Sequence, residues 1–98
     1  MLVRIVKLTF KKENIASFKQ IFKETKHTIR NFEGCSFLEL YQDKNNPTVF
    51  FTYSYWDTDN DLERYRNSDF FKQVWGKTKL LFAGKPEAWS LDSIERLN

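Results

Sequence analysis

The chain has 98 residues, of which 41% are hydrophobic and 30% charged, as is typical of one small globular domain spanning residues 1–98. No stretch approaches the roughly 20 apolar residues of a membrane span, so we expect no membrane association. The formal net charge of +3 arises from interspersed charges of both signs. This pattern permits nucleic-acid binding without predicting it.

A single cysteine, Cys35, excludes an internal disulfide framework and favours a reducing cytoplasm. Together with the single histidine, His27, it is too little for a closed zinc site of the His/Cys kind within one chain, so we expect no metal. Residues 1–7 alternate charged and apolar side chains and lack the apolar block of a signal peptide. These features together predict a cytoplasmic protein.

The first half of the chain predicts a strand, a helix and a hairpin. Residues 2–10 alternate between two faces, which predicts a strand with apolar residues on both sides. Apolar residues then recur every three or four positions from Glu13 to Asn31, which predicts an amphipathic helix that ends before Gly34. Residues 35–42 and 49–56 read as two strands, and the turn-forming residues 43–47 join them.

The second half predicts a broken helix and a last strand. Asp57 or Thr58 caps a short helical piece, and Ser68 caps a second piece that ends before Gly84. Residues 87–92 read as the fourth strand. The order βαββαβ predicts an α+β, ferredoxin-like fold, in which a four-stranded antiparallel sheet carries two helices on one face.

Two helices cover only one face of such a sheet, and the other face is rich in apolar and aromatic side chains. The alternation places five of them there: Val3, Ile5, Phe51, Tyr53 and Tyr55. An exposed apolar face of this size is unusual in a monomer. We therefore expect it to be covered, either by a second copy of the same sheet in a homodimer or by stacked nucleic-acid bases.

Between Ile29 and Phe71, a series of residues occurs at the spacing of a known family: Glu33-Gly34-Cys35, Phe37, Glu39, Gln42-Asp43, Pro47, Phe50, Tyr55-Trp56-Asp57, Leu62, Tyr65, Ser68 and Phe71. In these residues the chain resembles the antibiotic biosynthesis monooxygenase superfamily. The resemblance implies a cytoplasmic homodimer in the form of a dimeric α/β barrel, with a pocket between each sheet and its own helices. Several members oxygenate aromatic polyketides or quinols without a metal or flavin, because the electron-rich substrate itself activates oxygen.

The chain departs from that pattern at positions where many relatives carry histidine, which here are Tyr65 and Phe70. The haem-ligating histidine of the haem-degrading branch falls at Trp75, and the asparagine of that branch falls at Val6. Because an indole does not ligate iron, we expect no haem degradation and no cofactor. With those histidines missing, the catalytic residues remain unidentified.

We expect a substrate pocket between the helices and the sheet, lined by Arg4, Trp56, Tyr65, Phe71 and Trp75. The Trp56 indole N–H would donate to a ligand carbonyl, and the Tyr65 phenol would orient a substrate hydroxyl. The Arg4 guanidinium would point either at a pocket anion or out to the sheet edge. Ordinary core packing is the alternative reading of all four aromatic residues.

Three function classes are compatible with these observations. The favoured one is a cofactor-independent monooxygenase acting on a small aromatic or quinol-like substrate, and the alternative is a non-catalytic ligand-binding or structural barrel. An RNA-binding module shares the βαββαβ order but requires a basic-Gly pair where this chain has Val49-Phe50. We therefore expect no nucleic-acid binding.

Overall fold

The computed structural model describes residues 1–98 as a four-stranded sheet with three α-helices. The elements are β1 (Leu2–Thr9), α1 (Ile15–Arg30), β2 (Cys35–Gln42), β3 (Val49–Trp56), α2 (Asp59–Arg66), α3 (Asp69–Thr78) and β4 (Glu87–Asp92), with short 3-10 turns at Lys12–Asn14 and Lys79–Leu81. The first strand is one residue shorter than predicted, because Phe10 forms only an isolated bridge with Phe82. The first helix starts at Ile15 rather than Glu13, since the 3-10 turn precedes it.

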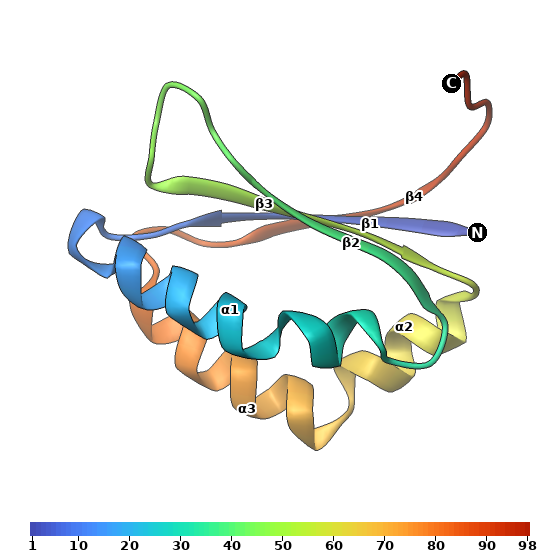
Figure 1. The fold of residues 1–98 in the computed structure, drawn as a ribbon, viewed down its shortest axis with the longest axis horizontal. Helices are drawn as coiled ribbons and strands as arrows, with labels where there is room; N and C mark the ends of the chain where they lie inside the picture. The colour runs from blue at the N-terminus through green and yellow to red at the C-terminus, as the bar shows by residue number, and fades with distance from the viewer.

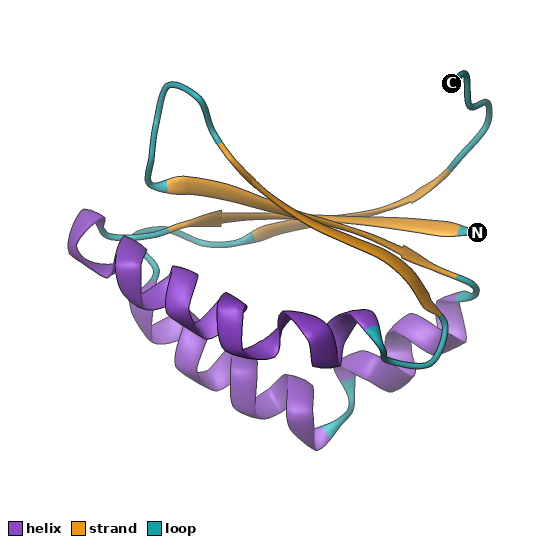
Figure 2. Cartoon of the chain, in the orientation of Figure 1, coloured by secondary structure: helices purple, strands orange, loops and turns teal.

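The sheet has the strand order β2-β3-β1-β4, and all neighbouring strands are antiparallel. In the central pair, β1 runs against β3 from Leu2 opposite Trp56 to Thr9 opposite Val49. All three α-helices lie on one side of the sheet, and the opposite side carries none (Figures 1 and 2). This arrangement confirms the predicted ferredoxin-like fold.

Side-chain caps explain why the second helical segment is broken in two. The Thr58 hydroxyl accepts a hydrogen bond from the backbone N–H of Asp61 and so begins α2. The Ser68 hydroxyl accepts from the N–H of Phe71 at 3.1 Å and begins α3, while it donates to the carbonyl of Tyr65 at the end of α2. Ser68 therefore stops one helix and starts the next, which sets the angle between them.

Gly34 has a structural role beyond ending the first helical segment. Its φ of +88° lies in the left-handed region that favours glycine. A Cβ at this position would overlap the Asp61 side chain, whose Oδ2 would lie only 2.6 Å away. The entry into β2 thus packs directly against the first turn of α2, and only glycine fits there.

The core lies on the helix side of the sheet in two separate clusters. One consists of Leu8, Phe10, Phe18 and Phe50, and the other of Leu2, Cys35, Trp56 and Leu62. The β1 members are even-numbered, as the predicted alternation requires. Within the first cluster the rings of Phe10 and Phe18 stack at 4.2 Å. The two clusters fix the two ends of the sheet against the helices.

The face without helices carries more apolar surface than the sequence predicted. Trp89 and Leu91 on β4 are 42% and 44% exposed, and both share this face because they pair with Ile5 and Val3. Val3 itself departs from the expectation of an accessible contact residue, since it is only 7% exposed. Its cross-strand neighbours Tyr55 and Leu91 flank it on either side.

Candidate functional site

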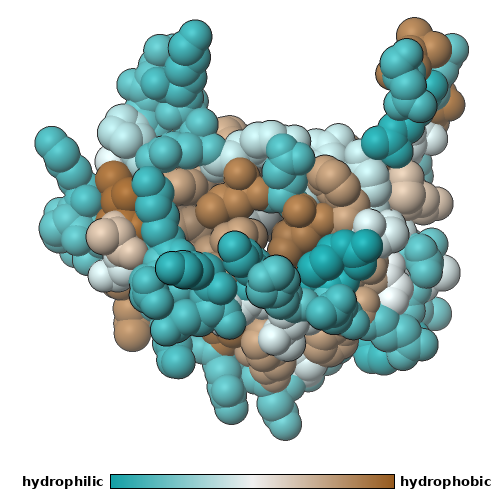
Figure 3. Space-filling view, viewed as in Figure 1, coloured by the Kyte–Doolittle hydropathy of each residue, from teal (hydrophilic) through white to brown (hydrophobic).

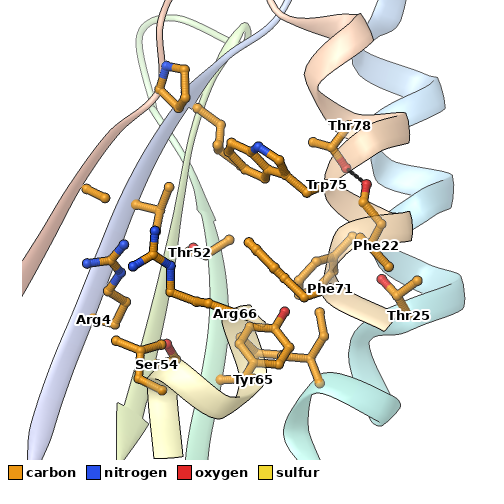
Figure 4. A pocket seen from close by; sticks show the side chains of 18 of the residues that line it. Arg4, Phe22, Thr25, Thr52, Ser54, Tyr65, Arg66, Phe71, Trp75 and Thr78 are labelled. Carbon is orange, nitrogen blue, oxygen red and sulfur yellow. Dashed lines mark hydrogen bonds between the residues drawn. The ribbon is translucent and has the colours of Figure 1, made fainter. Parts of the chain in front are cut away.

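A cavity of about 490 Å³ lies between the sheet and the helices. It is lined by all five residues that the sequence predicted for a pocket: Arg4, Trp56, Tyr65, Phe71 and Trp75. Figure 4 shows Arg4 on the strand side, with Phe71 and Trp75 on the helix opposite. Around it, α1 packs on β2 and α2 packs on β3, whereas α3 contacts mainly the 3-10 turn that follows it, α1 and α2.

Four of these residues form a continuous row of aromatic rings. The ring of Trp56 stacks on that of Tyr65 with centroids 5.0 Å apart, and Tyr65 lies 5.1 Å from Phe71. Phe71 and Trp75 stack at 5.8 Å with only 16° between their planes. Such a row offers a flat, apolar wall against which an aromatic molecule can pack.

Trp56 departs from its expected role as a hydrogen-bond donor to a ligand. Its indole N–H donates to the Ser54 hydroxyl at 3.0 Å, and the residue is only 1% exposed. Ser54 precedes it by two positions, so both side chains are on the same face of β3. The indole therefore provides wall surface and has no free donor.

Tyr65 is the main polar group among the aromatic residues. Burial raises the pKa of its phenol above the ordinary range, so the hydroxyl stays protonated at neutral pH. No other side chain or backbone group of the chain hydrogen-bonds this hydroxyl, and it is not among the fully buried polar atoms. It is therefore a free donor facing the cavity (Figure 4).

Three threonines also line the cavity, and two of them have their hydroxyl protons engaged. Thr25 donates to the carbonyl of Ile21 and Thr78 to that of Val74, each at 2.8 Å. Thr52 on β3 also lines the cavity, from the sheet side. The threonine hydroxyls are neutral, and the cavity is lined by no imidazole and by a single carboxylate, that of Glu63.

Charged side chains lie at one end of the cavity. Arg4 is half-buried, and its Nη1 donates to the Ser90 hydroxyl of β4 at 2.9 Å. Arg66 lies beside it (Figure 4) and was missed at the sequence level. No signal along the sequence indicated Arg66, because adjacent residues of a helix point about 100° apart.

A second, smaller cavity of about 250 Å³ lies between α1 and β2. It shares Phe22 and Leu38 with the larger cavity. Figure 3 shows hydrophobic side chains gathered in a recess on this side of the molecule, bordered by hydrophilic ones. His27 lies on its rim and is exposed, in agreement with its predicted surface position.

Cys35 and the acidic residues contribute no reactive centre to the site. The Cys35 thiol is buried, and burial raises its pKa, so it is a poor nucleophile.

No group of three His, Cys, Asp or Glu side chains is placed to hold a metal ion. None of the helices is both long enough and apolar enough to cross a membrane.

Comparisons with known proteins agree with the fold of the chain. A family model described as antibiotic biosynthesis monooxygenase matches residues 1–75. The fold is similar to the crystal structure of an antibiotic biosynthesis monooxygenase, with TM-score 0.91, 18% identity and coverage of 97% of this chain and 100% of the other. A conserved protein from Methanosarcina mazei gives 0.86, with 23% identity over 93% and 91% of the two chains. A Mycobacterium tuberculosis protein gives 0.89, with 11% identity over 99% and 98%. No curated protein matches the chain by sequence.

Proposed function

The chain belongs to the antibiotic biosynthesis monooxygenase family, and on this premise we propose that it oxygenates a small aromatic or quinol-like substrate in the cavity between sheet and helices. The observation that carries the proposal is the row of aromatic rings from Trp56 to Trp75 along a cavity of about 490 Å³. That volume lies in the range of small-molecule sites. Arg4, Trp56, Tyr65, Phe71 and Trp75 are the proposed substrate-binding residues.

The proposed reaction draws its electrons from the substrate. A quinol bound in the cavity reacts with O2, one oxygen atom becomes a new ring hydroxyl, and the other leaves as water. The quinol is oxidised to a hydroxyquinone in the same reaction, so that atoms and electrons balance without an external reductant. In this scheme neither a metal nor a flavin takes part.

Tyr65 has a specific role in this scheme. Its phenol stays protonated because burial raises its pKa. It therefore donates a hydrogen bond to a substrate oxygen and stabilises negative charge that develops there as the quinol is deprotonated. It does not act as the general base, because its phenolate is inaccessible at neutral pH. The aromatic wall orients the substrate ring and excludes water.

Proteins of this family are typically dimeric, and we infer that this chain forms a cytoplasmic homodimer through the face of its sheet without helices. The proposed contact residues are Val3, Ile5, Phe51, Tyr53 and Tyr55, to which the exposed Trp89 and Leu91 add apolar surface. A face of this composition suits the large apolar interfaces of obligate dimers. Occupation of this face by a second sheet also leaves no stacking surface for nucleic-acid bases.

The test is to titrate quinols and hydroxylated bicyclic aromatics while following tryptophan fluorescence and oxygen consumption. We expect saturable quenching accompanied by oxygen uptake and formation of a hydroxyquinone. Tyr65→Phe should slow oxygen uptake by about 100-fold to 1000-fold, the scale of one lost oxyanion donor. The control variant Tyr41→Phe, on the opposite face of the sheet, should not change it.

The alternative function is a non-catalytic ligand-binding barrel, which the lack of a histidine along the cavity favours. Saturable binding without oxygen uptake would support this alternative and refute the monooxygenase proposal. Absence of binding by every aromatic probe would refute both.

A further inference from the structure

The charged end of the cavity contains two arginines from different elements. Arg4 comes from β1 and Arg66 is the last residue of α2, and both line the cavity. Their side chains lie beside each other at the same end of the cavity (Figure 4). Burial and the nearby charge of Arg66 lower the pKa of Arg4, as expected for two guanidinium groups close together.

The positive charge at this end is only partly compensated. Arg4 makes no ion pair, and its one hydrogen bond within the chain goes to the neutral hydroxyl of Ser90. Arg66 pairs with Glu63 at 3.1 Å, but both side chains are about half exposed, so this pair is weak. Glu63 is the single carboxylate along the cavity, against the three cations Arg4, Arg66 and Lys72.

Arg4 is half-buried, and the nearby Glu63, which is itself paired with Arg66, offsets its charge only in part, so the desolvation of this guanidinium is not fully compensated. Arg4 has five N–H donors and uses one of them within the chain. The free donors of two adjacent guanidinium groups match the two oxygens of a carboxylate, which arginine binds in a fork geometry. The rest of the cavity is lined mainly by apolar and aromatic side chains, with a few neutral polar groups and Lys72.

We propose that the molecule bound in this cavity is an aromatic carboxylate, whose carboxylate is held by Arg4 and Arg66 while its rings lie against Phe71 and Trp75. This inference rests on the proposed function and names the substrate class of that site. It also assigns Arg66 a specificity role. The substrate thus has two ends, with the oxidisable ring inside near Tyr65 and the acid at the charged end.

The experiment compares a matched pair of probes, 1-hydroxy-2-naphthoate and its neutral methyl ester, by fluorescence titration at constant ionic strength. We expect the acid to bind at least about tenfold more tightly than the ester, the scale of a lost charge-assisted contact. Arg66→Gln and Arg4→Gln should each weaken binding of the acid by about tenfold and that of the ester by less than about twofold. Lys77→Gln removes one positive charge from an exposed site outside the cavity. It should change neither the affinity for the acid nor the affinity for the ester.

The outcomes separate this inference from the function on which it rests. Equal binding of acid and ester, with oxygen uptake on neutral quinols, would overturn the carboxylate assignment and leave the monooxygenase proposal intact. The carboxylate assignment would also be overturned if both Arg4→Gln and Arg66→Gln still bound the acid more tightly than the ester. Arg66 is exposed, so Arg66→Gln is expected to fold normally even if Arg4→Gln does not, and the far-ultraviolet circular dichroism of each variant checks this.

Discussion

Gly34→Ala is expected to destabilise the protein strongly, although it adds only one methyl group. The residue has a φ of +88°, and an alanine Cβ would overlap the Asp61 side chain. Asp61 is buried, and its Oδ2 accepts a hydrogen bond from the Thr58 hydroxyl at 2.9 Å. It cannot move away from a new methyl group without disturbing the cap of α2.

The magnitude follows from two separate costs. Holding a non-glycine residue in the left-handed region costs about 1–2 kcal/mol. Displacing Asp61 weakens the cap at Thr58, and the loss of a cap costs about 1 kcal/mol. The free energy of unfolding should therefore fall by about 2–3 kcal/mol, a large part of the 5–15 kcal/mol that is usual for a domain. Because α2 carries Tyr65, binding of aromatic ligands should weaken as well.

Urea unfolding followed by tryptophan fluorescence measures the effect, at one protein concentration because the stability of a dimer depends on concentration. Gly76→Ala is the matched control, since Gly76 lies within α3 and its added Cβ would meet no atom within 4 Å. It should stabilise the protein by up to about 1 kcal/mol, the helix propensity difference between the two residues. A Gly34→Ala variant within about 0.5 kcal/mol of the wild type, the scale of a neutral surface substitution, would refute this reasoning.

Further predictions concern pH, thiol reactivity, assembly and nucleic acid. Burial raises the pKa of Tyr65 in the folded state, so the free energy of unfolding should fall as pH rises above 10, by up to about 1.4 kcal/mol per pH unit. Tyr65→Phe should remove this pH dependence in urea titrations. The same pH dependence in the wild type and in Tyr65→Phe would contradict the prediction. Cys35 should react with a thiol reagent at pH 8 at least about tenfold more slowly in the folded protein than in urea, as absorbance would record. Tyr53→Asp should dissociate or unfold the dimer in sedimentation experiments, and a monomeric wild type at micromolar concentration would refute the assignment of the interface. Single-stranded RNA should not be retained at physiological salt in a filter-binding assay, and salt-resistant binding lost in Tyr53→Ala would overturn this expectation.

Short periodicities along the sequence, together with the family resemblance, predicted five of the side chains that line the cavity. The family resemblance placed Arg4 and Trp56, which belong to two different strands, on the helix side of the sheet. A spacing of four placed Phe71 and Trp75 on one face of a helix. Ser68 was recognised as a cap, which located the break between α2 and α3.

The errors arose where the outcome depends on packing in three dimensions. The bond from the Trp56 indole to Ser54 depends on the rotamer of Trp56, which the alternation of a strand does not specify. The position of Arg66 at the cavity depends on how α2 is rotated about its axis. The burial of Val3 depends on how Tyr55 and Leu91 lean over it. None of these is encoded in the spacing of residues along one element.

The placement of β4 has a consequence for the way molecules enter and leave the cavity. All six of its residues are exposed, and the strand pairs only with β1, yet it supplies Ala88 to the cavity and Ser90 to Arg4. Local unfolding costs least where few buried contacts are lost, as in β4 of a single chain, and burial of Trp89 and Leu91 in the proposed dimer would raise that cost. Transient detachment of β4 would open one wall without separating the helices from the central strands. Ligand access would then depend on how often this edge strand frays. A ligand that contacts both Arg4 and the aromatic rings would hold β4 in place through Ser90 and would therefore dissociate more slowly.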